Sequence, residues 1–410
     1  MNTSDTMNLP AGVPLRQDVG VIGLVGIAHM ISHYSQLLIA PLFPWLKTEF
    51  NVSYAELGFL MTIFFVVSCA VQALSGFVVD KLGPRPILFG GLALIGVAAM
   101  GYATSPNYWT MAAWTIVGGI GNGVFHPVDY TLLNRKVSAP RLGHAYSVHG
   151  ITGSLGWALA PAMLVPLTLA FSWRVALGCA SALAFAVLVV LVLNRDKLHL
   201  AVAAPAKGAP VEDSGLGFLK IPAVWMCFAF FFWYAIVLSV VQAFAPEAAR
   251  QLHDMPLSLV ASCLTIYMLC SSGGMVFGGF LAADPSRCER IVGIGFGMAA
   301  VVALYLALGT FSAWLVPVLF GLMGFASGIA GPSRDMLVKR STPANASGRV
   351  YGVVYAGLDI GQAVAPLVFG VMMDHGYYRG VLLGLAVMQG VLIASAFNVR
   401  RVRRTALVTA

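Results

Sequence analysis

The chain has 410 residues, of which 59% are apolar and only 10% are charged, against about 25% charged in an ordinary soluble domain. This composition excludes a typical cytosolic enzyme. The formal charge of +8 would suggest a nucleic-acid partner in a soluble protein, but the long segments are too apolar to form a phosphate-binding surface, so we expect no nucleic acid as a partner.

Long apolar segments follow one another along the whole chain. A helix needs about 20 mostly apolar residues to cross the hydrocarbon core of a bilayer, where its backbone groups are paired within the helix. Such segments occur twelve times, so the sequence predicts an all-α membrane protein with twelve transmembrane helices. We place them near residues 19–46, 56–79, 86–104, 108–133, 144–169, 173–194, 221–246, 257–282, 290–310, 312–338, 349–373 and 379–398.

The basic residues are divided unevenly between the connecting loops. With both ends inside, 19 of the 24 Lys and Arg fall in cytoplasmic loops, four fall in outer loops, and Arg334 falls within a helix. Cytoplasmic loops of membrane proteins carry such an excess of Lys and Arg. The sequence therefore predicts a multi-pass protein of the inner (plasma) membrane, in contact with the lipid bilayer, with both termini in the cytoplasm.

The second half of the chain repeats the first. When the sequence is shifted by 205 positions, 15 of the 66 residues from 109 to 174 are identical to their counterparts. Transporters are commonly built from duplicated bundles with the binding site between them, so we predict two pseudo-symmetric six-helix bundles. The expected parts are a cytoplasmic tail at 1–18, bundles at 19–194 and 221–398, a cytoplasmic linker at 195–220, and a basic cytoplasmic tail at 399–410.

Repeated glycines and prolines indicate how the bundles are built. The repeat pairs a G-x-x-x-G motif at residues 119–123 with another at 324–328. Because such a motif leaves one helix face without side chains, neighbouring backbones can approach closely. Pro127 and its counterpart Pro332 interrupt the helical hydrogen bonds, so we expect both helices to be kinked there.

Motifs of enzymes and of ATP-driven pumps are missing from the sequence. It contains no G-x-x-x-x-G-K-[ST], H-E-x-x-H or G-x-S-x-G pattern. The six cysteines lie mostly inside apolar segments and form no C-x-x-C pair, which is typical of packing residues. We therefore expect no enzyme activity, no cofactor and no metal site.

The segment after the second predicted helix carries a recognisable pattern. Residues 76–85 read G-F-V-V-D-K-L-G-P-R and resemble the loop signature G-x-x-x-D-[RK]-x-G-[RK] of the major facilitator superfamily, with Pro84 at one basic position. The resemblance implies the major facilitator fold, in which two six-helix bundles rock around a central cavity. Asp80 and Arg85 would then help to latch a cytoplasmic gate.

A narrower resemblance involves the first and fourth predicted helices. Residues 28–33 (A-H-M-I-S-H) and 125–127 (F-H-P) are similar to the H-x-x-N-D and F-H-P-E patterns of the fosmidomycin-resistance group of efflux proteins. In this chain Ser32-His33 replaces the Asn-Asp pair, and Val128 stands where the group has Glu. The resemblance implies efflux, although a role of the replaced Asp does not carry over.

Ionisable side chains at membrane depth are functional candidates, since each costs several kcal/mol to bury there. His29 and His33 lie four residues apart and so share one helix face. They are candidates for binding a polar or anionic substrate, and His33 also for exchanging a proton. Two alternatives stay open: both rings are bonded to neighbouring helices, or they bind a transition metal, for which the sequence offers no third ligand nearby.

Asp359 lies in the middle of the eleventh predicted helix, deeper than the other carboxylates of the chain. A buried carboxyl group without a fixed partner suits the loading and release of a proton. We therefore expect Asp359 to carry the coupled proton. The alternative is a permanent pair with a His or Tyr side chain.

Other charged residues are expected near the cytoplasmic ends of their helices. Counting at 1.5 Å per residue from the outer ends puts Asp129, Arg334 and Asp335 there, and Asp129 could pair with Arg85. The alternative for Arg334 is to clamp a carboxylate or phosphonate substrate. The predicted gating residues are Asp80, Arg85, His126, Asp129, Arg334 and Asp335.

Taken together, these features favour a secondary active transporter that moves a small polar or anionic organic solute by alternating access. Proton-coupled efflux is the expected mode, proton-coupled uptake of a carboxylate is the alternative, and a transporter-like membrane sensor is the alternative from a different class. We expect a monomer. The predicted substrate-binding residues are His29, His33, Tyr34, Gln36, His149, Trp233, Tyr234, Tyr355 and Gln362.

Overall fold

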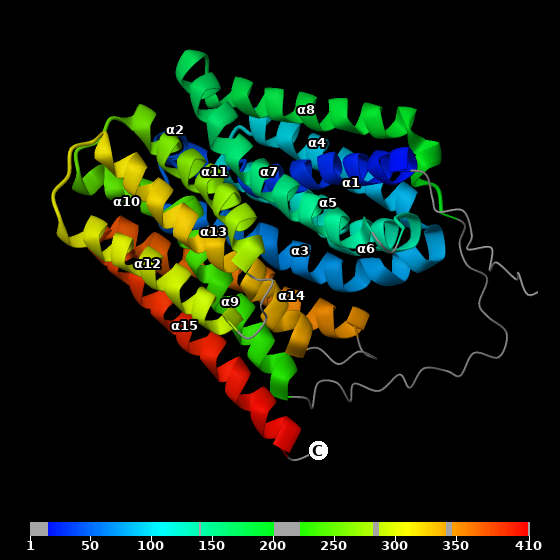
Figure 1. The fold of residues 1–410 in the computed structure, drawn as a ribbon. Coiled ribbons are helices and arrows are strands. Elements are labelled where there is room, and N and C mark those ends of the chain that lie inside the picture. The colour runs from blue at the N-terminus through cyan, green and yellow to red at the C-terminus, as the bar shows by residue number, and fades with distance from the viewer. Residues whose placement is uncertain (1–14, 139–140, 201–221, 282–286, 342–346, 409–410) are drawn as a thin grey trace, which may run out of the picture.

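The structure is a computed structural model that describes residues 15–138, 141–200, 222–281, 287–341 and 347–408. Within these ranges the regular elements are helices, as the sequence predicts (Figure 1). They are α1 (Leu15–Gln36), η1 (Ala40–Leu42), α2 (Phe43–Phe50), α3 (Tyr54–Leu82), α4 (Pro84–Thr104), α5 (Tyr108–Asn122), α6 (Phe125–Lys136), α7 (Leu142–Ala170), α8 (Trp173–Leu193), η3 (Arg195–Leu198), α9 (Pro222–Ala243), α10 (Ala245–Leu252), α11 (Leu257–Leu281), α12 (Cys288–Leu308), α13 (Leu315–Ser341), α14 (Ser347–Asp374) and α15 (Tyr378–Val408).

Eleven helices of the described residues are long and apolar enough to cross a membrane. The fourth predicted segment, 108–133, accounts for the difference from twelve, because it forms two shorter helices, α5 with 15 residues and α6 with 12. The break falls just before Pro127, whose ring lacks an N–H and clashes with the carbonyl group of the preceding turn. Its counterpart Pro332 lies inside α13, which continues to Ser341.

The first and seventh predicted segments, 19–46 and 221–246, are also divided into shorter helices. α1 stops at Gln36 and is followed by η1 and α2, while α9 stops at Ala243 and is followed by α10. Pro41 and Pro246, which the 205-residue shift relates, lie in the first turns of η1 and α10. Proline is favoured at such positions because its missing N–H has no partner there, so each half turns at a matched proline.

The G-x-x-x-G motifs mark the closest helix contacts of each half. An added Cβ would lie 2.6 Å from the carbonyl oxygen of Phe64 at Gly119, and 2.2 Å from that of Tyr267 at Gly324. The predicted close approach of backbones is therefore confirmed. α5 packs on α3 in the first half, and α13 packs on α11 in the second.

The described helices form a first helix set, α1–α8, and a second helix set, α9–α15. They contact each other along α3 with α14 and along α7 with α11, and their helices diverge toward the end of the molecule that holds the C-terminus (Figure 1). Most of the predicted linker 195–220 and of the tail 1–18 lies outside the described residues, and α15 runs through most of the predicted tail 399–410.

Asp374 joins the two helix sets at the opposite end. Its carboxylate accepts hydrogen bonds from the backbone N–H groups of Tyr54 (2.6 Å) and Ala55 (2.9 Å) at the start of α3, where the helix dipole favours negative charge. The ammonium group of Lys47 lies 3.8 Å from the same carboxylate. Since the Tyr54 hydroxyl also donates to Glu247 of α10 over 3.2 Å, this end of the molecule is latched across the interface.

Replacing Asp374 should loosen this latch. Asp374→Ala removes both backbone hydrogen bonds, worth about 1–2 kcal/mol together, so we expect the ratio of separated to closed molecules to rise about 5–30-fold. Pulsed electron paramagnetic resonance between spin labels at positions 109 and 314, with the native cysteines replaced by alanine, measures this ratio. Asp254→Asn, at an exposed position, is the control. An unchanged distance distribution in Asp374→Ala would show that Asp374 is no latch.

A histidine cluster and a cavity between the helix sets as candidate functional site

Four histidines and one aspartate meet inside the first helix set. The rings of His29 and His149 stack with centroids 3.5 Å apart, and those of His29 and His33 are 4.3 Å apart. Gly153 of α7 makes room for them, because a Cβ there would lie 2.7 Å from the His33 ring. The members of this histidine cluster are His29 and His33 on α1, His126 and Asp129 on α6, and His149 on α7.

Asp129 holds the cluster together. It is fully buried, and its Oδ2 lies 3.0 Å from Nδ1 of His29 and 3.1 Å from Nε2 of His149. The expected pairing of Asp129 with Arg85 near the cytoplasmic surface is therefore wrong. Counting along one helix could not reveal this pairing, because its partners lie on α1 and α7.

Metal-ligand geometry occurs twice in the histidine cluster. One ligand atom each from His29, His33 and His126 lie within 4.8 Å of one another, and so do ligand atoms of His29, Asp129 and His149. The expectation that the histidine pair has no third ligand nearby is thus wrong, because the third ligands come from α6 and α7, about 90 residues or more away in the sequence.

Gln72 of α3 connects the histidine cluster to the second helix set. His126 Nδ1 lies 2.8 Å from Gln72 Oε1, and Gln72 Nε2 donates to Oδ2 of Asp359 over 3.3 Å. Tyr355, one turn before Asp359 on α14, has its ring 6.2 Å from that of His126. Asp359 is thus bonded to a glutamine of the other helix set, rather than to the His or Tyr that the sequence left open.

A cavity with about 350 Å³ of free space lies between the helix sets. Arg334 of α13 lines it, half-buried, with its guanidinium carbon 4.3 Å from the ring centre of Tyr234. Arg334 thus lies beside a space between the helix sets. The other lining residues are Ser154 and Trp157 of the first set, and Leu238, Tyr267, Met268, Ser271, Met275, Ser327 and Gly331 of the second.

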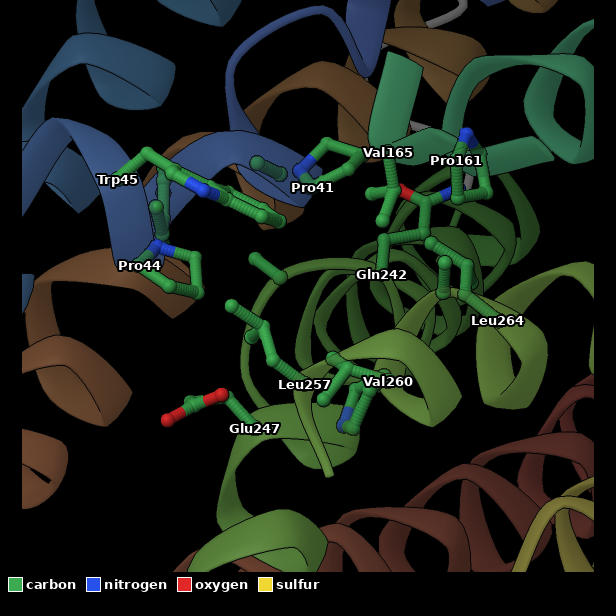
Figure 2. Close-up of a pocket in the computed structure, with 15 residues that line it drawn as sticks. Pro41, Pro44, Trp45, Pro161, Val165, Gln242, Glu247, Leu257, Val260 and Leu264 are labelled. Atoms are coloured by element: carbon green, nitrogen blue, oxygen red, sulfur yellow. The ribbon is translucent and has the colours of Figure 1, made fainter. Parts of the chain in front are cut away.

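A second cavity of about 430 Å³ lies nearer the latched end. Figure 2 shows that mostly apolar side chains of both helix sets surround it, among them Trp45, Pro161 and Leu257. The carboxylate of Glu247 at its edge is already bonded to Arg250 over 2.6 Å. The described lining of this cavity includes no cationic side chain, whereas Arg334 lines the first cavity.

Most of the remaining predicted binding residues contact other side chains of the protein. Gln36 accepts a hydrogen bond of 2.9 Å from the indole of Trp157, whose ring stacks on His33 at 4.3 Å. Tyr34 donates to a methionine sulfur over 3.4 Å, and Gln362 donates to another glutamine over 3.1 Å. Trp233 packs against apolar core residues.

The loop signature connects α3 to α4 through a single glycine. Gly83 has a φ of +80°, a conformation that residues with a side chain rarely adopt, which explains the glycine of the pattern at this position. Arg85 follows in the first turn of α4 and is half-buried. The side chains of Asp80 and Asp335, predicted at the gate, lie outside the part of the chain whose side chains are described.

Sequence reasoning missed several polar residues of the site. Gln72 and Asn122 lie within apolar segments, and Asn122 accepts a hydrogen bond of 2.7 Å from Ser32 and donates one of 2.9 Å to Ser68. A polar amide inside an otherwise apolar helix is the signal that could have found both. Trp157, in the cavity wall, carried no such signal because aromatic residues are common in membrane helices.

Comparison with known proteins identifies the family. The model of the Major Facilitator Superfamily matches residues 25–322 and, in an overlapping second match, residues 255–408. The fosmidomycin resistance protein of Escherichia coli (strain K12) is 28% identical over 148 residues, 36% of this chain and 36% of that protein. The membrane sensor protein UhpC of the same organism is 21% identical over 368 residues, 83% of this chain and 82% of that protein.

The matches to relatives of higher identity are partial. At 26–29% identity, the chain spans about a third of the length of the curated relatives that it matches. Among solved structures, a bacterial homologue of the human lysosomal transporter Spinster, in an inward-facing and occupied conformation, superposes with a TM-score of 0.74 at 14% identity, over 96% of this chain and 98% of that chain.

The family match extends over nearly the whole chain, and the solved structure shares its fold. The predicted fold class and the resemblance of the 76–85 loop are therefore confirmed. The family and its structural neighbours are membrane transporters, not enzymes. This chain belongs to the Major Facilitator Superfamily.

Proposed function

We propose that the protein is a proton-coupled secondary transporter that exports a small organic anion across the inner membrane, working as a monomer with both termini in the cytoplasm. The observation that carries this proposal is Arg334, a cation in the wall of a cavity that both helix sets line. A site between two helix sets can open to either side as they rock.

The cavity suits a compact carboxylate or phosphonate. The planar guanidinium of Arg334 offers donors in a fork that matches two anionic oxygens, and its carbon lies 4.3 Å from the centre of the Tyr234 ring. The hydroxyl groups of Ser154 and Ser271 and the indole of Trp157 line the same space.

Asp359 is the proposed proton carrier. It lies on α14, where the second helix set contacts α3, and its only described hydrogen bond crosses that interface to Gln72. An ionised carboxylate is costly at membrane depth, so moving α14 against α3 is easier once a proton has neutralised it. We assign the proton to Asp359 rather than to His33, because His33 stacks on Trp157 inside the first helix set.

Replacing Asp359 tests the coupling. A thermal-shift screen of carboxylates, phosphonates and related antibiotics first identifies a solute, since bound ligand raises the melting temperature. In liposomes, Asp359→Asn should lose at least nine-tenths of the transport driven by a pH gradient and keep exchange of labelled for unlabelled solute. Asp254→Asn, an exposed carboxylate, should keep both. Unchanged pH-driven transport in Asp359→Asn would remove the carrier role.

The same liposomes separate the alternatives. The match to a membrane sensor over 83% of the chain makes sensing the second candidate function, and a sensor would bind the solute without moving it. Proton-coupled uptake of a carboxylate would move the solute in the direction of the proton gradient. Export requires movement against it, so the sign of the flux decides between the two transport modes.

A further inference from the structure

We infer that His29, His33 and His126 form a binding site for one divalent first-row transition-metal ion, such as Zn²⁺ or Co²⁺. Imidazole nitrogens are preferred ligands of these ions. The inference concerns a ligand other than the proposed organic anion, and it stands on the geometry of the histidine cluster, independently of whether Arg334 binds a solute.

The distances fit an ion after a small adjustment. One ligand atom from each of the three histidines lies within 4.8 Å of the other two. Four-coordinate zinc holds imidazole nitrogens at about 2.0–2.1 Å, which puts neighbouring nitrogens about 3.4 Å apart. Side-chain rotations that bring the nitrogens closer by up to about 1.4 Å therefore complete the site, and a solvent or solute atom can supply the fourth ligand.

Two of the rings have hydrogen-bond partners that leave one nitrogen available for an ion. Nδ1 of His29 faces Asp129 at 3.0 Å, and Nδ1 of His126 faces Gln72 Oε1 at 2.8 Å. Because both partners are acceptors, each Nδ1 carries the hydrogen and each Nε2 keeps a free electron pair. A metal-binding histidine commonly donates its other ring N–H to a carboxylate or carbonyl oxygen in this way.

The third ring has a nitrogen without a partner. Nδ1 of His33 is buried and has no hydrogen-bond partner among the described residues. It faces the side-chain-free Cα of Gly153 together with Nε2 of His29, since an added Cβ there would lie 2.7 Å and 3.1 Å from these two nitrogens. The free nitrogens of His29 and His33 thus point to the same place beside α7.

Charge balance also favours a divalent cation. Behind His29 lies Asp129, and behind His126 lies Asp359, connected through Gln72. Asp129 offsets one positive charge of the ion, and Asp359 offsets the second while it is ionised. The other geometric set, His29 with Asp129 and His149, is already joined by two hydrogen bonds, so we assign it to positioning the ligands.

Metal binding is tested on the whole protein, purified through a tag without histidines and stripped with a chelator. Dialysis against Co²⁺ should leave one ion per chain with the strong visible absorption of a four-coordinate site, and Zn²⁺ should displace it. His33→Ala and His126→Gln should each weaken Co²⁺ binding at least 100-fold. Asp129→Asn should weaken it about 10–100-fold, as expected for a carboxylate that orients a ligand.

Controls distinguish this site from accidental binding. The exposed His375→Ala should bind Co²⁺ like the unmodified protein, and each variant is compared only if it elutes as one species and melts cooperatively without metal. His126→Gln retains an amide for Gln72 and replaces His33→Ala if that variant does not fold. Less than 0.2 ions per chain, binding that survives both substitutions, or loss of binding in His149→Ala but not in His126→Gln would each overturn the inference.

Discussion

Arg334→Gln is expected to weaken binding of the transported anion about 100-fold, because it leaves the anionic group in the cavity without its positive partner. Losing one partner of a desolvated charge pair costs about 2–5 kcal/mol, and 100-fold corresponds to about 2.7 kcal/mol. Transport at low solute concentration should fall by the same factor. Calorimetry or fluorescence titration with the solute identified by screening measures the affinity.

Two further arginine variants sharpen this result. Arg334→Lys keeps the charge but loses the planar fork and the contact of the guanidinium with the Tyr234 ring, so we expect an intermediate loss of affinity of about 10-fold. Arg379→Gln removes a cation from an exposed position at the start of α15 and should have no effect. An affinity that falls equally in Arg334→Gln and Arg379→Gln would indicate a general charge effect and exclude the clamp.

Gly156→Val is expected to cause the largest loss of stability among the substitutions considered for this protein. An added Cβ would lie 2.2 Å from the carbonyl oxygen of Met30 and 3.0 Å from the backbone nitrogen of Tyr34. Backbone atoms cannot rotate away as a side chain can, so α1 and α7 must separate. We expect a loss of about 3 kcal/mol or more, visible as a melting temperature lower by at least about 5 °C.

A matched glycine in a neighbouring helix provides the control. A Cβ at Gly178 of α8 would meet nothing within 4 Å, so Gly178→Val should melt within about 1 °C of the unmodified protein. Gly156 also lies beside His33. Solute affinity and metal binding of Gly156→Val are therefore measured below its melting temperature, where the variant is folded. A variant with unchanged stability would mean that α1 and α7 are not packed as closely as described.

The fold could be predicted from the sequence wherever the signal is local. The apolar segments and the G-x-x-x-G motifs each lie within one helix, and the repeat recurs at a fixed offset of 205 residues. These signals predicted most of the helices and the close contacts between them. The breaks could not be predicted in the same way. Hydropathy averages over about 20 residues, so it does not register the two-residue interruption between α5 and α6.

The candidate site was less predictable, because its residues come together only through packing. The spacing of His29 and His33 indicated a shared face, but the ligands that join them on α6 and α7 depend on how three helices cross. The partners of Asp129, His29 and His149, likewise lie on other helices, so counting along its own helix did not find them. Gln72 links two residues that lie more than 200 positions apart, and no sequence spacing reports such a link.

The break between α5 and α6 makes α6 a short helix of its own. Pro127 has no N–H to donate to the carbonyl group of Gly123, so the ladder of helical hydrogen bonds is weakened where α5 meets α6, and a tilt of α6 is easiest at this hinge. The hinge end carries His126 and Asp129, and the far end carries Arg135 and Lys136, about 9 Å beyond Asp129 along the axis. Because all four side chains belong to one short helix, a tilt of α6 would move the basic end together with the two side chains that contact Gln72 and His29.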